Sequence, residues 1–575
     1  MKSSLSSGLP VKQSPILLLL FLLTLACQRK PASWEGPTLS RPRSQLTAGE
    51  LLSGRQPPLL DMSFFARPEW ADSAGTPFSG TLALPRTALT YPKEKAYYPE
   101  ENYFPQLELH FLTHRGILLP AQAGRIHTSG SYWDVFIGYG KVWQEPTDGP
   151  WSRAAFPLTL TDRWMGQARN CVATFVYQKD TVSQVCLQCS QETADIDDQQ
   201  LGNISAMLPA QFRPGPLPDS AQLVEQYQSW LGRQLPVRPL SEWDAEGEIA
   251  AYFNRSIYTN APTSLGAVLA DSQLYVHPPH TRHGPYPFPE DMRHGLYSVT
   301  KSMAGALALL HLEERYPDDL LNTPIADYVP ALAEAPGWQG VTFSHTLNML
   351  SGTAGGEGPE QLFLPLISAA TAEEAIRNIA LLGDAPPLPG AQFNYASTNL
   401  FVLSYALQQY VEEKEGPAAR YWDIVHRDVL VPIGAGGFTI LHTQGDQARA
   451  IPRLAYGALP TLDEAAKIAL LFANKGQHEG KQLLHRKSTE EALGGEWEGH
   501  PTGGDFRGSR YRHSFWSKTI PAGPCEVEAI YMLGFGENYV VFLPSGIILF
   551  RFMDEHDLNI DPLIQAVERR ASSCR

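Results

Sequence analysis

Ser298 and Lys301 are the residues of this 575-residue chain whose types and spacing most clearly allow chemistry. They form the only Ser-x-x-Lys pattern in the sequence. Residues three apart lie on one face of a helix, so the hydroxyl and the amine can meet there. The unpaired N–H groups at the start of a helix also favour the negative oxygen that forms during acyl transfer. The pattern predicts a nucleophilic serine that is activated by a lysine.

The sequence after Lys301 predicts that this lysine is buried. It reads Ser-Met-Ala-Gly-Ala-Leu-Ala-Leu-Leu, which makes a helix that is apolar on most of its faces. Burial disfavours the charged amine, and lowering its pKa by ~3 units costs about 4 kcal/mol. A lysine with such a pKa can take the proton of Ser298 near neutral pH. Catalysis therefore explains why a lysine begins an apolar helix.

Four further motifs follow this pair along the chain, namely Asn322–Pro330, Val341–Gly352, Pro389–Asn399 and Tyr531–Pro544. Together with Leu296–Met303, they resemble in order and spacing the motifs of the penicillin-recognising superfamily of serine β-lactamases, DD-peptidases and related esterases. The resemblance covers about residues 240–570. It implies an α+β fold, with an antiparallel sheet flanked by helices and a helical subdomain. It also implies hydrolysis through a serine acyl-enzyme, with no cofactor and no metal.

The resemblance assigns roles to individual residues of the expected site. Tyr395 would relay a proton to the leaving group, and Ser397 stands where the family commonly has a hydrogen-bonding asparagine. The backbone N–H groups of Ser298 and Phe535 would form the oxyanion hole, with Gly534 next to it in the third motif.

The third motif also indicates a branch of the family. It reads Leu533-Gly534-Phe535 in place of Lys-Thr-Gly, which resembles the 6-aminohexanoate-dimer hydrolases and carboxylesterases. Lys518-Thr519-Ile520 begins like Lys-Thr-Gly but lacks its glycine, so it is not expected to serve as the third motif. We therefore expect a serine hydrolase that cleaves small esters or amides. A DD-peptidase or β-lactamase is the nearest alternative, and a catalytically idle binding lipoprotein is an alternative of another class.

The first 27 residues are typical of a lipoprotein signal peptide. Lys2 and Lys12 precede an apolar run from Ile16 to Leu25, which is about half the ~20 residues that a membrane-spanning helix needs. Leu-Ala-Cys27 resembles a bacterial lipobox, in which the cysteine carries the lipid. We expect an exported bacterial lipoprotein of the cell envelope, attached to the membrane at Cys27. Plain cleavage, with Cys27 an ordinary residue, is the alternative.

Three more regions follow the signal peptide. Residues 28–215 contain short alternating or apolar runs separated by turn residues and predict a mostly-β domain, either a sandwich or a small barrel. A Pro-rich linker and a helix occupy 216–238, and the hydrolase domain occupies 239–575. Every motif lies after the linker, so we expect the segment from about residue 236 to fold and hydrolyse a generic ester alone.

The remaining cysteines fit an oxidising compartment. Their odd number allows one disulfide among Cys171, Cys186 and Cys189 and another between Cys525 and Cys574. A redox or zinc role for the Cys186-Leu-Gln-Cys189 pair is not expected, because no second such pair follows.

Two further features exclude other classes of function. His277, His280 and His283 have metal-like spacing, but the intervening prolines prevent a helix, so no metal site is expected. The net charge is −15 and no basic run occurs, which argues against nucleic acid as a partner.

Overall fold

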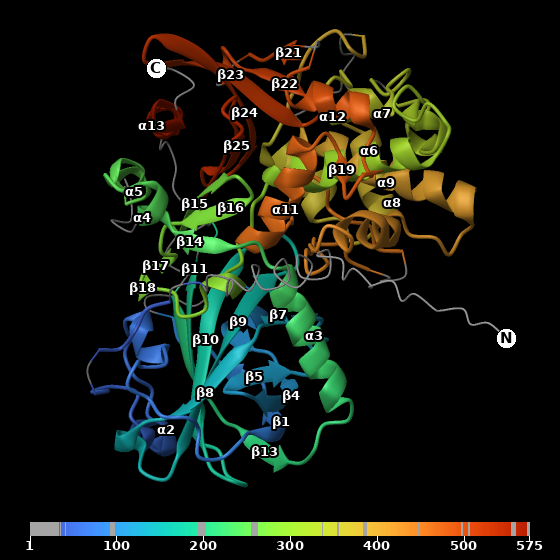
Figure 1. Ribbon diagram of the computed structural model, residues 1–575. Coiled ribbons are helices and arrows are strands. Elements are labelled where there is room, and N and C mark those ends of the chain that lie inside the picture. Colours follow the sequence, from blue (N-terminus) through green and yellow to red (C-terminus); the bar gives the residue numbers. More distant parts are fainter. Residues whose placement is uncertain are drawn as a thin grey trace, which may run out of the picture.

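The computed structural model describes residues 34–571. Within this range it leaves out 35, 41, 92–97, 192, 194–202, 255–262, 336, 353–355, 383–387, 446–448, 496–497, 504–505 and 554–558. The strands form two large sheets, one that ends with Pro214 and one that begins with Val237 (Figure 1). Cys27 and Cys574 lie outside the described residues, so the lipid anchor and the second disulfide stay predictions. Cys525 itself takes part in a disulfide.

The first sheet has eleven strands, nine of them in the order β12-β11-β10-β9-β8-β5-β4-β1-β13, with β7 paired to β9 and β6 to β7. Its strands are β1 (Ser79–Leu84), β4 (Leu107–His114), β5 (Ile117–Pro120), β6 (Gly124–Ile126), β7 (Trp133–Ile137), β8 (Gly140–Gln144), β9 (Ser152–Asp162), β10 (Ala168–Tyr177), β11 (Val185–Gln191), β12 (Ile204–Leu208) and β13 (Gln211–Pro214). All of their pairings are antiparallel.

This sheet folds over its own apolar core. Phe78, just before β1, lies 5.4 Å from the ring of Phe175 and 5.1 Å from that of Tyr177 on β10, although β10 is far from β1 in the strand order. In β4, buried residues first alternate with exposed ones, as expected for a strand with one face in a core. By contrast, β9 and β10 are buried at every position. Both faces of these central strands are therefore covered.

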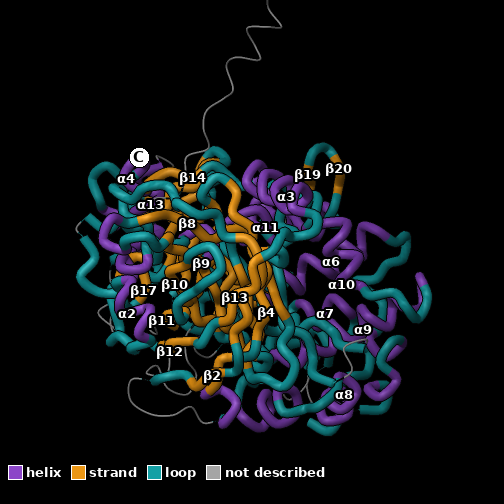
Figure 2. The backbone as a smooth tube through the Cα atoms, turned by 90° about the horizontal axis from the view of Figure 1, so that it is seen from below, coloured by secondary structure: helices purple, strands orange, loops and turns teal. Residues whose placement is uncertain are grey.

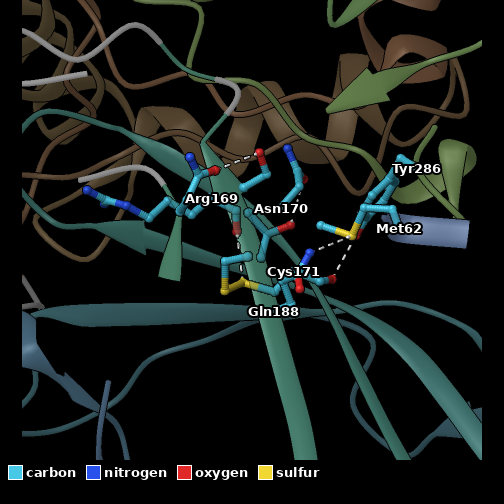
Figure 3. The surroundings of a disulfide bond; sticks show 10 residues. Met62, Arg169, Asn170, Cys171, Gln188 and Tyr286 are labelled. Atoms are coloured by element: carbon cyan, nitrogen blue, oxygen red, sulfur yellow. Dashed lines mark hydrogen bonds between the residues drawn. A yellow bond between two sulfur atoms is a disulfide. The ribbon is translucent and has the colours of Figure 1, made fainter. Parts of the chain in front are cut away.

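A disulfide joins two central strands of the first sheet. Cys171 on β10 lies directly opposite Cys189 on β11, and the two are bonded (Figure 3). Cys186 stays a buried thiol, and burial raises its pKa to about 12. Residues three apart in a strand point to opposite faces, so Cys186 and Cys189 cannot serve one redox or zinc site.

The second sheet joins distant parts of the chain. Its order is β14-β16-β15-β26-β25-β24-β23-β22-β21, and β15 pairs with β26 from the other end of the domain. The strands are β14 (Val237–Pro239), β15 (Leu265–Ala270), β16 (Gln273–Val276), β21 (His500–Pro501), β22 (Arg510–Arg512), β23 (Phe515–Ala522), β24 (Cys525–Gly534), β25 (Asn538–Phe542) and β26 (Ile548–Phe552). Apart from the parallel pair of β14 and β16, the sheet is antiparallel.

Helices cover both faces of the second sheet. Figure 1 shows α4 (Leu240–Trp243), α5 (Glu248–Phe253) and α13 (Asp561–Ala571) on one side. The other side carries α6 (Leu307–Arg315), α7 (Phe343–Leu347), α8 (Ala372–Ala380), α9 (Ser397–Glu415), α10 (Tyr421–Val425), α11 (Leu462–Ala473) and α12 (Arg486–Ala492). Figure 2 shows that α6 to α10 gather into a helical region beside the strands. The fold is thus α+β and β-lactamase-like, as expected.

Local sequence explains where individual elements begin. The Thr461 side chain accepts from the backbone N–H of Glu464 while the Glu464 side chain accepts from that of Thr461, which is a capping box at the start of α11. Between β24 and β25 the chain turns at Gly536 and Glu537, which both have positive φ. Among the described residues, no helix has the length and apolarity required to cross a membrane.

The disulfide should contribute measurably to stability. It closes a loop of 18 residues, so replacing Cys171 and Cys189 together with serine should lower the free energy of unfolding by about 3 kcal/mol. Urea denaturation under oxidising conditions measures this, and Cys186→Ala, which removes the free thiol, should cost about 1 kcal/mol. A double variant as stable as the original protein would show that the bond stabilises nothing.

Candidate active site

Ser298 lies in a turn immediately before a helix. Tyr297, the residue before it, has φ of 44°, a left-handed conformation that is rare for a tyrosine. The backbone N–H of Lys301 donates to the carbonyl of Ser298 at 3.0 Å, and a π-helical stretch, Lys301–Ala306, continues into α6. Backbone strain of this kind gathers at functional sites, where it holds a side chain in a set direction. Here the strained residue directly precedes the expected nucleophile.

Lys301 is buried, with 1% of its surface exposed, and its amine is surrounded by oxygen atoms. Nζ donates to Ser298 Oγ at 2.8 Å, to Ser397 Oγ at 2.9 Å and to the carbonyl of Ala455 at 3.0 Å. Burial lowers the pKa of Lys301 to about 8, against the charge of Glu357, which raises it. The structure thus brings the sequence-predicted pair together in the arrangement that proton transfer requires.

Tyr395 lies beside this pair. Its ring centroid is 4.8 Å from Lys301 Nζ, and its side chain forms a hydrogen bond with that of Ser298. Burial, reinforced by the charge of Glu357, raises the pKa of Tyr395 above its ordinary value, and the bond to Ser298 opposes this. Tyr511 and Trp516 pack around the ring, with centroids 6.2 and 5.5 Å away. Tyr395 is therefore a neutral phenol that can donate a proton.

Ser397 is the first residue of α9 and connects Lys301 to a carboxylate. Its backbone N–H donates to Glu357 Oε1 at 2.6 Å, and its Oγ donates to Glu357 Oε2 at 2.8 Å. Sequence reasoning missed Glu357. The available signal was a lone charge in the glycine-rich run Gly355-Gly356-Glu357-Gly358, which follows the Ser351-Gly352 end of a recognised motif.

The third motif lies against the nucleophile turn. A Cβ at Gly534 would come within 2.1 Å of the carbonyl oxygen of Leu296 and 3.1 Å of the nitrogen of Val299, so glycine is required at this end of β24. The Phe535 ring meets that of Tyr297 edge-on at 5.5 Å and is 44% exposed. The backbone of Phe535 thus borders the turn that carries Ser298, where the oxyanion hole was expected.

The first domain also supports this site, which sequence reasoning did not predict. The carboxylate of Asp162, at the end of β9, accepts from four successive backbone N–H groups, those of residues 164–167. The loop so formed contacts the chain at Gly295, before Ser298, and at Gly457, after Ala455. A Cβ at Gly295 would meet the Gly166 carbonyl at 2.0 Å, and one at Gly166 would meet Gly457 Cα at 3.2 Å.

Hydrogen bonds also connect the same loop to the segment around Ala455, whose carbonyl accepts from Lys301. Gln444 Nε2 donates to the carbonyl of Arg163 at 2.9 Å, and Arg453 donates to the carbonyl of Trp164 and to the hydroxyl of Tyr456. The backbone N–H of Gly295 donates to Thr193 Oγ1 at 2.8 Å.

Further contacts join the two domains beside the disulfide. The hydroxyl of Tyr286 donates to the carbonyl of Cys171 at 2.8 Å (Figure 3). Asn170 exchanges two hydrogen bonds with the backbone of Arg293. The two domains are thus in direct contact here, and independent folding and activity of the segment from about residue 236 stays a prediction.

Other candidates from the sequence lie away from this constellation. Lys518 forms an ion pair with Asp561 on α13, on the opposite face of the sheet. His277 Nε2 lies 3.0 Å from Asn254 Oδ1, and burial lowers the pKa of His277 to about 4. Within the described part of the chain, no three His, Cys, Asp or Glu side chains form a metal-binding group.

Asp162→Ala should loosen the loop that supports the site. Four backbone N–H groups lose a charged acceptor, so we expect the free energy of unfolding to fall by about 3 kcal/mol or more. Hydrogen exchange should also increase around residues 453–458, which the loop contacts. Asp180→Ala, in the exposed turn between β10 and β11, is the matched control and should change neither quantity. Unchanged exchange at 453–458 in Asp162→Ala would exclude the supporting role.

The chain is similar to several known proteins. Solved structures similar to this chain include a family VIII carboxylesterase (18% identity; 58% of this chain and 98% of that one; TM-score 0.45). Another is a penicillin-binding protein homologue from Caulobacter crescentus (16% identity; 57% of this chain and 98% of that one; TM-score 0.44). A third is a D-amino acid amidase from Ochrobactrum anthropi SV3 (14% identity; 57% of this chain and 100% of that one; TM-score 0.43). No curated protein matches the chain in sequence. Residues 265–542 match the family model described as beta-lactamase. This second domain, which holds Ser298 and Lys301, therefore belongs to the serine β-lactamase-like superfamily of hydrolases.

Proposed function

We propose that the protein hydrolyses small esters or amides through an acyl-enzyme on Ser298. The observation that carries the proposal is the 2.8 Å contact between Ser298 Oγ and the amine of Lys301, a buried lysine whose pKa is lowered to about 8. In its neutral form this amine has a lone pair and can accept the serine proton. The fraction of neutral amine falls as the pH drops below about 8, so the rate should fall on the acid side.

The proposed reaction has two halves. Ser298 Oγ attacks the substrate carbonyl carbon as its proton passes to Lys301 Nζ, and the backbone N–H groups of Ser298 and Phe535 stabilise the oxyanion. The bond to the leaving group then breaks, and the leaving group takes a proton from Tyr395, which regains one from Lys301. Water next attacks the acyl carbon as one of its protons passes to Lys301 Nζ. The bond from the acyl carbon to Ser298 Oγ then breaks, Oγ takes that proton from Lys301, and the acid is released. The raised pKa of Tyr395 supports a proton relay over a tyrosinate base.

The third motif supports esters or amides without a carboxylate over β-lactams. In β-lactamases and DD-peptidases the lysine of Lys-Thr-Gly binds the substrate carboxylate, whereas Leu533 occupies that position here. The charge beside Lys301 in this site is the carboxylate of Glu357, which would repel an anionic substrate.

Ser298→Ala should abolish hydrolysis of p-nitrophenyl acetate and labelling by a fluorophosphonate, because the nucleophile is gone. Lys301→Ala should reduce kcat by roughly 10³-fold or more, and Tyr395→Phe by about 10²-fold or more, since both act on the same proton. Intact-mass analysis after labelling measures the first effect and steady-state kinetics the others. Ser302→Ala, one residue beyond the lysine, controls for local packing. Hydrolysis of p-nitrophenyl acetate by Ser298→Ala at the rate of the unchanged protein would contradict the mechanism.

We also propose that Cys27 is lipidated and attaches the protein to a membrane of the cell envelope. The support is the apolar run Ile16–Leu25 followed by Leu-Ala-Cys. Cys27→Ser should move the protein from the detergent phase to the aqueous phase in Triton X-114 partitioning, or leave it unprocessed. Cys186→Ser is the control and should partition like the unchanged protein. Equal partitioning of the Cys27→Ser variant and the unchanged protein would contradict the anchor.

A further inference from the structure

Glu357 contacts the proposed active site through Ser397. Its two carboxylate oxygens accept from the backbone N–H and the hydroxyl of Ser397 at 2.6 and 2.8 Å. The same hydroxyl oxygen accepts from Lys301 Nζ at 2.9 Å. A chain of two hydrogen bonds thus runs from the buried amine to an exposed carboxylate. The chain joins residues that are far apart in the sequence.

The charge of Glu357 acts on four buried ionisable groups. It raises the pKa of Lys301, and it also raises those of Tyr395, Tyr456 and Tyr511, which burial has already raised. Burial and this charge thus both favour the neutral form of the three phenols. Of the charged side chains in the described residues, Glu357 is the one that affects Lys301. The protonation of the lysine thus depends on two opposing factors, burial and this carboxylate.

We propose that Glu357 is a positioning residue of this site, whose carboxylate holds the Ser397 hydroxyl against Lys301 and supplies the negative charge that the lysine faces. The proposal rests on the proposed function of Ser298 and Lys301. Glu357 touches neither the expected nucleophile nor the substrate carbonyl in this scheme. It acts on the reaction by setting the pH at which Lys301 becomes a base.

A purely structural role is the competing explanation. Ser397 begins α9, and a carboxylate that accepts from the first N–H groups of a helix stabilises its start. Glutamine at position 357 can still accept a hydrogen bond from the Ser397 N–H, but it has no charge. Glu357→Gln therefore separates the two roles, because capping is largely kept while the charge on Lys301 is lost.

The test measures the rate of Ser298 labelling by a fluorophosphonate between pH 5 and 10, which needs no knowledge of the natural substrate. Removing the carboxylate disfavours the protonated amine, so the pKa of Lys301 falls. The acid limb of the Glu357→Gln profile should move to lower pH by about 1 unit. Glu357→Asp, which keeps the charge, should stay near the original profile. Glu360→Gln removes an exposed charge from the same segment and should not move the limb.

An unmoved acid limb in folded Glu357→Gln would overturn the proposal and leave helix capping as the role of the residue. Should that variant fail to fold, Ser397→Ala removes the hydroxyl bridge and should move the limb in the same direction; an unmoved limb there would overturn the proposal too. Failure of the proposed function is distinguishable, because the label would then be absent from Ser298 in the unchanged protein.

Discussion

The site depends on a buried ammonium group. Lys301 sits in the helical core of the second domain, where an unpaired charge would cost several kcal/mol. Three oxygens offset that cost, and they come from three places in the chain: Ser298 at the helix start, Ser397 at the start of α9, and the carbonyl of Ala455. Because the amine needs all three, its burial fixes how these segments are arranged. The same arrangement places the hydroxyl of Ser298 beside the amine of Lys301.

The segment that carries Ala455 is held from outside the second domain. Arg453 and Gly457, on either side of it, contact the loop that Asp162 organises in the first domain. The Gly166 carbonyl of that loop leaves no room for a side chain at Gly295, three residues before the nucleophile. Interiors packed this closely transmit small displacements. The described residues of the first domain therefore contact the segments that position the site.

The sequence predicted the members of the candidate site that depend on local spacing or on recognised motifs, and the structure brings their side chains together. Ser298 and Lys301 share a helix face, and the positions of Tyr395, Ser397 and Phe535 followed from motif resemblance. Glu357 could not be found in this way, because its contact with Ser397 joins residues 40 apart across a loop. The support that the Asp162 loop gives to the site could not be predicted either, because a Pro-rich stretch between two domains does not indicate how tightly the domains pack. Arg213 and Pro214, which directly precede that stretch, still pair with β1 as part of β13.

Burial and the charge of Glu357 have opposing effects on the pKa of Lys301, and this explains why the carboxylate lies so near the lysine. Burial alone would make the amine a better base near neutral pH, but it would also raise the cost of folding whenever the amine is charged. The charge of Glu357 stabilises the ammonium form and so reduces that cost, while it moves the pKa back toward its ordinary value. With a pKa of about 8, the lysine is still partly neutral at neutral pH and remains tolerable in the core when protonated. Placing the carboxylate behind Ser397 achieves this balance, because direct ion pairing would hold Lys301 permanently charged and leave Ser298 without a base.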